Sequence, residues 1–467
     1  MTDQFKDAVP HTGDLQPASE GTALRRELGL FDAIAIVAGT VIGSGIFLVP
    51  NSVAKQLPSL AAVLLVWLTG GLLSLFGALA LGELGTAFPG AGGLYVYLRQ
   101  AYGRVIGFLY GWGLLTLIHS GSIATLAVAF RIYLAQIVPL TINQQKLAGV
   151  ACVLVLTGLN CLGVRSGKGA QNIFTVAKFG GLALMIGLLF FRGSAHLLRA
   201  SVWPRPAMEF HPASFGIALI AVLWAYEGWH VVSFTAGEFR HSQRDLPRGL
   251  FYGTLIVAVT YILANIAYYC VLTPAQIQQT GRVAATAVNS VSGGTAAFFI
   301  SMLILVSIVG AANGMILTGP RVYYAMAKEG LFFRAFGTVS ARFRAPVLAI
   351  VIQGVWAACL TLLGSFQELF TYVVFTAWIF YGLAVAGVIV LRMRRPELDR
   401  PFRAPGYPWL PALFAIAALG ITLSAAVSSP LHALLGIGLV LTGLPVYALF
   451  LARAKKPLLK QGSISST

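Results

Sequence analysis

Apolar segments long enough to cross a lipid bilayer follow one another through almost the whole sequence. A helical span needs about 20 mostly apolar residues, and by that rule the chain holds about twelve. The sequence therefore predicts an all-α integral membrane protein. The expected spans are 30–53, 60–87, 104–137, 147–163, 171–191, 213–236, 248–272, 297–325, 346–364, 368–391, 409–428 and 431–452.

The charged residues indicate how the chain is oriented. Only 10% of the residues are charged, whereas a soluble protein carries about a quarter, and the net charge is +17. With the N-terminus inside, most Lys and Arg residues fall in cytoplasmic loops, as the positive-inside rule expects. This pattern predicts a multi-pass cell-membrane protein with both termini cytoplasmic and contact with anionic lipid, and it argues against nucleic acid. Six basic residues are expected outside: Lys55, Lys146, Arg192, Arg199, Arg205 and Arg282.

The stretch Gly43-Ser44-Gly45 lies in the middle of the first segment. Two glycines and a serine make the helix weakest here, and backbone groups freed at membrane depth must face protein or a polar cavity. A half-helix that restarts near Ile46 would point its N–H groups at that cavity, where they could hold a carboxylate. The alternative is close helix packing through small residues.

Residues 224–230 of the sixth segment repeat this feature, because Gly228 interrupts an apolar run. Broken helices at matching places in two inverted halves typically mark a transporter site. The sequence thus predicts a 5+5 inverted repeat with unwound first and sixth helices and two extra C-terminal helices. The expected units are a cytoplasmic tail (1–28), the two repeats (29–200 and 201–395), the last two spans (396–453) and a second cytoplasmic tail (454–467).

Some polar residues lie inside the predicted spans. Glu227 is an intramembrane acid and therefore a candidate for the site, or else a protonated acid that binds the freed backbone. His119 and His230 are candidates for a side-chain pocket, although a lone His is more often a satisfied core residue. Lys178 lies about 10 Å into the fifth span. It either snorkels to the interface or acts as an internal cation that bonds carbonyls near Gly43.

Motifs of soluble enzymes are missing from the sequence, which contains no HExxH, P-loop or GxSxG. The seven histidines have no metal-ligand spacing, and the four cysteines lie in apolar segments where free thiols are the default. We therefore expect neither an enzyme nor a bound cofactor or metal.

Short motifs occur in order along the chain: 41–47 with Pro50, 82–85 with 89–93, 224–229, 236–238 with 244–247, 313–314 with Arg321 and 328–330, and 391–392 with 395–398. Together they resemble the amino acid–polyamine–organocation superfamily over nearly the full length. The resemblance is closest to the L-type branch and its bacterial serine/threonine exchangers. It implies the LeuT-like fold shared with sodium-coupled amino-acid transporters.

The resemblance also implies how an amino acid is held. Its carboxylate would bind N–H groups around Ser44, Gly45 and Ile46, next to Gly43. Its α-amino group would bind carbonyls near Ile42 and at Trp224, Ala225 and Glu227, with the Trp224 ring as a gate over the site.

Lys178 matches a lysine of the fifth helix that replaces sodium in this branch, and Ser307 matches a nearby serine of the eighth helix. The resemblance therefore favours a sodium-independent exchanger of neutral L-amino acids that works by alternating access. A proton-coupled symporter of amino acids or polyamines is the alternative, and Glu227 motivates it. A receptor that binds without transport is a third hypothesis, disfavoured by the short tails.

The chain departs from the animal members of this branch in one loop. Those members carry a cysteine after the third span for a disulfide to a heavy-chain subunit, whereas residues 141–145 contain none. We therefore expect no disulfide-linked heavy-chain partner. His230 and Ala377 replace other polar residues, so the preferred amino acid stays open.

Overall fold

The computed structural model describes residues 26–57, 59–135, 137–202 and 211–455, and within these ranges the regular structure is helical. The first part of the chain begins with a pair of short helices and continues with longer ones. Its elements are α1 (Leu30–Val41), α2 (Gly45–Gln56), α3 (Leu60–Ala87), α4 (Leu94–Tyr102), α5 (Arg104–Gly113), the π-helix η1 (Leu114–Ile118), α6 (His119–Leu134), α7 (Ile142–Cys161), α8 (Val164–Arg192) and α9 (Ala195–Val202).

The second part again begins with a short helix that is followed by irregular chain. Its elements are α10 (Pro212–Ala225), the 3₁₀-helix η2 (Val231–Glu238), α11 (Ser242–Val271), α12 (Pro274–Gln279), α13 (Val283–Thr318), α14 (Pro320–Lys328), the 3₁₀-helix η3 (Arg334–Gly337), α15 (Val347–Leu363), α16 (Phe366–Arg394), α17 (Trp409–Ser428), α18 (Pro430–Leu441) and α19 (Gly443–Lys455).

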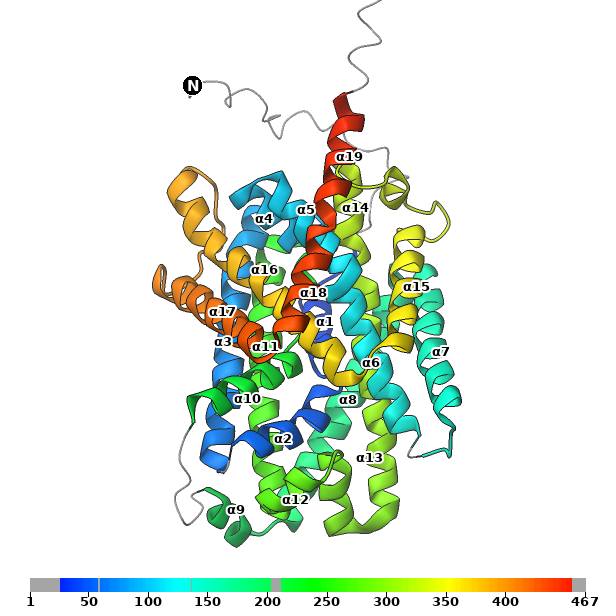
Figure 1. Cartoon of the computed structure of the whole chain (residues 1–467), viewed down its shortest axis with the longest axis vertical. Coiled ribbons are helices and arrows are strands. Elements are labelled where there is room, and N and C mark those ends of the chain that lie inside the picture. The colour runs from blue at the N-terminus through cyan, green and yellow to red at the C-terminus, as the bar shows by residue number, and fades with distance from the viewer. Residues whose placement is uncertain (1–25, 58, 136, 203–210, 456–467) are drawn as a thin grey trace, which may run out of the picture.

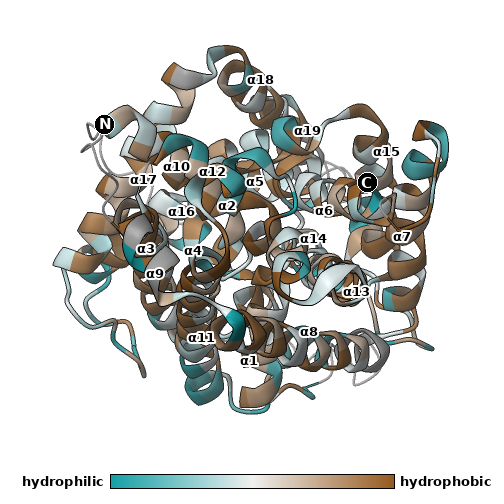
Figure 2. Ribbon diagram, turned by 90° about the horizontal axis from the view of Figure 1, so that it is seen from below, coloured by the Kyte–Doolittle hydropathy of each residue, from teal (hydrophilic) through white to brown (hydrophobic). Residues whose placement is uncertain are grey.

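The predicted membrane architecture is confirmed, although not span by span. Among the described residues, nine helical stretches are long and apolar enough to cross a membrane, and the bent pair α1 and α2 makes a tenth. Two further apolar helices, α10 and α15, are shorter. The prediction of about twelve spans corresponds to counting all of these. Viewed along the long axis, the helices at the periphery are mainly hydrophobic (Figure 2).

Both predicted helix breaks are present. α1 ends at Val41 and α2 begins at Gly45, with a bend of 44° between them. α10 ends at Ala225, and a turn leads into η2, so the second half of the sixth segment is a 3₁₀-helix. Gly228 has a φ of +111°, a conformation that residues with a Cβ rarely adopt.

Two other segments differ from the expectation. α13 begins at Val283, well before the predicted start at 297, and it changes direction at Gly293, whose φ is 78°. The last predicted span consists of two helices, α18 and α19, that meet at Thr442. The helical residues before 297 are mainly alanine, serine, threonine and glycine, which add little hydropathy, so a search for apolar runs missed them. The tails 1–25 and 456–467 lie outside the described residues.

The molecule has two distinct ends along its long axis (Figure 1). α4, α5, α14 and α19 lie at one end, the α4 end, and α9 and α12 lie at the other, the α12 end. Residues 27–28 join the α4 end, because the N–H groups of Glu27 and Leu28 donate to the carbonyl of Glu238 at 2.9 and 3.0 Å. The predicted cytoplasmic loops with Arg99, Arg104 and Lys328 lie at this same end.

Candidate substrate site

The two helix breaks touch each other in the centre of the molecule. A Cβ added to Gly45 would lie 2.5 Å from the Cα of Ala225, so only glycine allows the start of α2 to approach the end of α10 so closely. The hydroxyl of Tyr261 on α11 lies 3.0 Å from the carbonyl oxygens of both Val41 and Ala225. One side chain therefore connects the ends of α1 and α10.

A small buried cavity lies between the breaks. Its volume is about 10 Å³, which is room for roughly one water molecule. The residues that line it are Thr40, Val41, Gly43, Ser44, Gly45, Leu126, Trp224, Glu227 and Met315. The set includes five of the predicted substrate-binding residues.

Unpaired polar atoms surround this cavity. The hydroxyls of Thr40 and Ser44 and one carboxylate oxygen of Glu227 are buried without a hydrogen-bond partner in the described chain. The N–H groups of Gly45 and Ile46 open α2 and lack intrahelical acceptors there. Buried polar groups are nearly always satisfied in folded proteins, so such a cluster indicates a place for a polar ligand.

Lys178 reaches the first break from α8. Its Nζ donates to the carbonyl oxygens of Gly39 at 2.6 Å, Ile42 at 2.7 Å and Ser307 at 3.0 Å, and the residue is only 1% exposed. The Ser307 hydroxyl donates to the same Ile42 carbonyl at 2.9 Å. The ammonium group is thus internal, bound to two carbonyls at the first break and to one of α13, and it does not reach the membrane interface.

Glu227 belongs to a buried chain of hydrogen bonds. The hydroxyl of Tyr381 on α16 donates to its Oε1 at 2.6 Å and lies 3.1 Å from Nε2 of His230. His230 is therefore linked to the cavity through Tyr381 but does not line it. His119 is also buried away from the cavity, with Phe234 packed edge-on between the two histidine rings.

Other predicted residues contribute through their backbones. The carbonyl of Ile42 is already bonded to Lys178 and Ser307, and that of Ala225 to Tyr261. The carbonyl of Ile46 accepts a 3.3 Å hydrogen bond from Tyr268 on α11. None of the three lines the cavity in this closed structure, and the hydrogen bonds to their carbonyls hold the breaks in shape.

Aromatic side chains close the cavity toward the α12 end. Trp224 lines it, stacks on Phe370 at 6.0 Å between ring centroids, and meets Phe366 edge-on at 6.3 Å. Both phenylalanines belong to the first turns of α16, which rises from there toward the α4 end (Figure 1). The Trp224 ring thus lies between the cavity and these two phenylalanines.

Polar contacts close the opposite side. Arg321 on α14 donates from Nε to Glu238 at 2.8 Å, and both side chains are about 1% exposed. The N–H of Gly92, just before α4, donates to the carbonyl of Phe234 in η2 at 3.1 Å. Glu329, Tyr95 and Arg99 form a further cluster of contacts at this end. Both routes to the cavity are therefore shut in this structure.

Comparison with known proteins identifies the family. The amino acid permease family model matches residues 28–450, almost the entire described chain. The chain belongs to the amino acid permease family. Permeases of this family are transporters, which confirms the prediction of a transporter and not an enzyme.

Similar permeases come from bacteria and mammals. The chain is 33% identical to the serine/threonine exchanger SteT of Bacillus subtilis (strain 168) over 92% of its length and 98% of SteT. It is 33% identical to the b(0,+)-type amino acid transporter 1 of Mus musculus, over 92% of this chain and 88% of that protein. The large neutral amino acids transporter small subunit 2 of Homo sapiens is 31% identical over 97% and 84% of the two chains. The predicted resemblance to the L-type branch and its bacterial exchangers is thus confirmed.

Two residues of the permease site escaped the sequence reasoning, namely Tyr261 and Tyr381. Each stands in an apolar helix that also contains other aromatic residues, and nothing in the local pattern distinguishes it. The available signal was that a buried Tyr hydroxyl needs a partner. Only the fold shows that the partners are the two breaks and Glu227.

We expect Tyr261→Phe to loosen the contact between the two breaks. The change removes the hydroxyl that donates hydrogen bonds to the carbonyls of Val41 and Ala225. We expect the free energy of unfolding to fall by about 1–3 kcal/mol. Thermal unfolding of the purified permease measures this loss. Tyr252→Phe on the same helix is the control, because Tyr252 is 46% exposed and the described chain offers its hydroxyl no partner. Equal melting temperatures for the two variants would contradict the expectation.

Proposed function

We propose that this permease is a sodium-independent exchanger of neutral L-amino acids that works by alternating access. The observation that carries the proposal is the position of the Lys178 ammonium. It binds three carbonyls from α1, the first break and α13, so a fixed positive charge stands where the freed backbone would otherwise attract a cation. A site that already holds its own cation has no need of a sodium ion.

The cavity suggests how the substrate binds. The carboxylate of an amino acid would accept hydrogen bonds from the N–H groups of Ser44, Gly45 and Ile46, where the partial positive charge at the start of α2 favours an anion. The Ile42 carbonyl already has two donors, so we assign the α-amino group to the Ala225 carbonyl and to Glu227.

The closed state supports alternating access. A cavity of about 10 Å³ has no room for an amino acid, so substrate entry requires one of its two covers to move. The cover at the α12 end is aromatic and contains Trp224, whereas the cover at the α4 end contains the Arg321–Glu238 ion pair. We propose that these covers open in turn, with Trp224 as the gate of the α12 end.

The location and orientation of the carrier in the membrane also belong to the proposal. We assign the α4 end to the cytoplasm, because the predicted cytoplasmic loops lie there, and we place the protein in the cell membrane with both termini inside. We keep 29–200 and 201–395 as the two repeats, since each begins with a broken helix.

We also propose that the carrier works without a disulfide-linked heavy chain. The loop before α7 contains no cysteine; instead Thr141 caps the helix by accepting from the N–H of Gln144. All four cysteines are free thiols. The name of the human relative identifies it as a small subunit, and the proposal marks a difference from it.

One observation favours proton-coupled symport as a second candidate. Glu227 lines the cavity, and one oxygen of its buried carboxyl group has no hydrogen-bond partner in the described chain. An acid in that position can hold a proton or the positive charge of a polyamine. Uptake by empty proteoliposomes under an imposed proton gradient, lost in Glu227→Gln, is the result that this candidate predicts.

The decisive test is counterflow in proteoliposomes. Liposomes loaded with an unlabelled neutral L-amino acid are diluted into sodium-free buffer that contains the labelled compound, and empty liposomes serve as the reference. We expect rapid labelled uptake only in the loaded liposomes, with no gain when sodium is added. Internal D-amino acid is the matched control for the stereochemistry of the site. Equal uptake by loaded and empty liposomes would refute exchange.

A further inference from the structure

Two cavities lie along α3 and α11 on the outside of the bundle, apart from the substrate cavity, and together we call them the groove. The cavity near the α4 end has a volume of about 610 Å³ and is lined by basic, aromatic and proline side chains that include Arg244, Arg248, Phe251, Phe402 and Arg403. Farther along the same two helices lies a second cavity of about 220 Å³ with an almost wholly apolar lining, which includes Leu68, Leu72, Leu75, Tyr226, Val259 and Leu263.

The larger of the two cavities is lined by arginines whose positive charge is mostly unpaired. Arg248 and Arg403 are exposed, and neither has an ion pair or a hydrogen bond with any residue that the structure describes. Arg244 pairs with its neighbour Asp245 at 3.0 Å, but 62% of its side chain is still exposed. Three guanidinium groups with at most one carboxylate between them favour an anion, and the bidentate geometry of arginine suits a phosphate.

The two cavities lie on one continuous strip of the helix pair. Leu79, Leu75, Leu72 and Leu68 follow one another at spacings of four, three and four residues, so they share one face of α3. The distance from Leu79 to Leu68 is about 16 Å at 1.5 Å per residue. One leaflet of a bilayer is about 15 Å thick, half of a 30 Å hydrocarbon core. The strip is therefore as long as one leaflet is deep.

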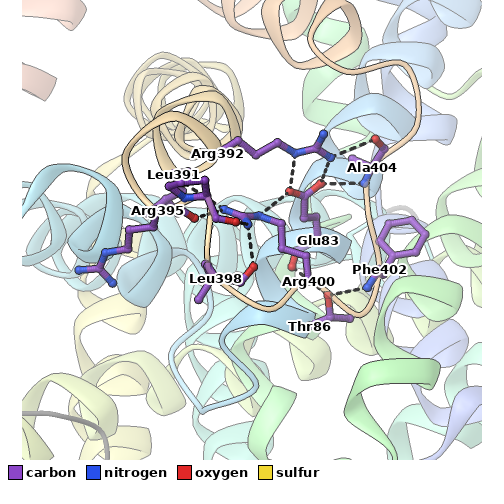
Figure 3. Close-up of polar contacts among 10 residues, drawn as sticks. Glu83, Thr86, Leu391, Arg392, Arg395, Leu398, Arg400, Phe402 and Ala404 are labelled. Atoms are coloured by element: carbon purple, nitrogen blue, oxygen red, sulfur yellow. Dashed lines mark hydrogen bonds and ion pairs between the residues drawn. The ribbon is translucent and has the colours of Figure 1, made fainter.

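A buried ion cluster fixes the wall that carries Arg403 (Figure 3). Glu83 near the end of α3 accepts from Arg392 at 2.9 and 2.6 Å and from the N–H of Ala404 at 2.8 Å, and Arg400 lies 3.4 Å away. These contacts tie residues 402–405 of the α16–α17 loop to α3. The basic wall is thus preorganised against the helix whose apolar strip it faces.

We propose that this groove binds an anionic glycerophospholipid. Its phosphate lies among Arg244, Arg248 and Arg403, and an acyl chain follows the apolar strip between α3 and α11. A lipid explains both parts of the groove, because a soluble phosphate would use the arginines but would leave the apolar strip empty. The strip is also open to the bilayer, since Leu72 is 42% and Val259 50% exposed.

The inner end of the groove gives the bound lipid a contact with the transport machinery. Tyr226 lines the deeper cavity, and it is the residue between the end of α10 and Glu227. Its hydroxyl donates to the carbonyl of Trp67 on α3 at 3.2 Å. An acyl chain at this point packs against the residue that begins the second helix break.

Lipid binding to the purified permease in detergent tests the proposal. Native mass spectrometry is used to titrate phosphatidylglycerol and phosphatidylcholine against the wild type, the double variant Arg248→Gln/Arg403→Gln, and Val259→Phe, which fills the apolar strip. The matched controls are Arg334→Gln/Arg342→Gln, two exposed arginines outside the groove, and Val155→Phe on α7, where Val155 is 70% exposed. Glycerol phosphate is added as a soluble competitor.

We expect the wild type to prefer phosphatidylglycerol and the groove arginine variant to bind it about thirtyfold more weakly, since each of the two basic residues contributes about five- to sixfold to the binding of an anionic lipid. Val259→Phe weakens the same binding, and both controls bind as the wild type does. Equal binding by the groove and control variants would overturn the site. Displacement by glycerol phosphate, together with unchanged binding by Val259→Phe, would overturn the lipid in favour of a soluble phosphate.

Discussion

Lys178→Ala is expected to abolish counterflow. The change removes a buried ammonium group from the carbonyls of Gly39, Ile42 and Ser307. Ile42 keeps its hydrogen bond from the Ser307 hydroxyl, but a buried carbonyl that loses its partner costs about 1–3 kcal/mol. The first break then loses the contacts that hold its shape beside the cavity. Labelled amino-acid uptake into loaded proteoliposomes measures the effect, and we expect it to fall to the level of empty liposomes.

A matched control variant, and the same assay with sodium added, make this result specific to Lys178. Lys55→Ala removes a lysine that is exposed on α2, within the same broken pair of helices, and should transport like the wild type. Purified Lys178→Ala is checked for a monodisperse elution profile, so that loss of transport is not loss of fold. If the ammonium takes the place of a cation, sodium restores part of the activity of Lys178→Ala but leaves the wild type unchanged. Full counterflow in Lys178→Ala without sodium would contradict the proposed role.

Gly45→Ala is expected to have the second-largest effect. The new Cβ would lie 2.5 Å from the Cα of Ala225 and 2.6 Å from its Cβ, so the ends of α2 and α10 must move apart. Overpacking of this kind costs about 1–3 kcal/mol, and if the transporting state bears this cost, the counterflow rate falls about fivefold to about 150-fold. Initial rates of counterflow and the melting temperature report the two consequences.

Other glycines provide graded controls for this prediction. At Gly43 the nearest atoms to an added Cβ are the Ala311 methyl and the end of Leu126, both at 3.0 Å, so Gly43→Ala should be milder. At Gly158 nothing lies within 4 Å, and Gly158→Ala should be neutral. Equal rates for Gly45→Ala and Gly158→Ala would show that the close approach of the two breaks does not matter for transport.

The fold was largely predictable because it rests on simple signals. The expected span 60–87 coincides with α3, and the first break falls at Gly43, because apolar length and clustered small residues determine both. The extra length of α13 was missed, since the alanines and serines before residue 297 are compatible with a helix but contribute little hydropathy. Local pattern does not reveal where such a helix begins.

The site was predictable only in part, because its polar groups converge from distant helices. Position alone left Lys178 between snorkelling and an internal role, and its contacts depend on how α8 crosses α1 and α13. Family resemblance supplied the role of the backbone at Ser44 but not Tyr261 or Tyr381, whose partners are set by packing across the sequence. His119 is a polar residue inside a span, as a pocket residue would be, yet in the fold it packs against Phe234 and does not line the cavity.

The contacts of Lys178 have a consequence for how the carrier could concentrate an amino acid against its gradient. A dissociable ion travels down its own gradient and can perform work on a co-transported solute, whereas an ammonium group that is covalently part of the chain is released to neither compartment. A carrier organised around such a group gains nothing from the electrochemical potential of that cation. For the exchanger that we propose, net enrichment of one amino acid is then limited by the outward gradient of another, so the carrier would redistribute the pool of amino acids and leave its total size unchanged.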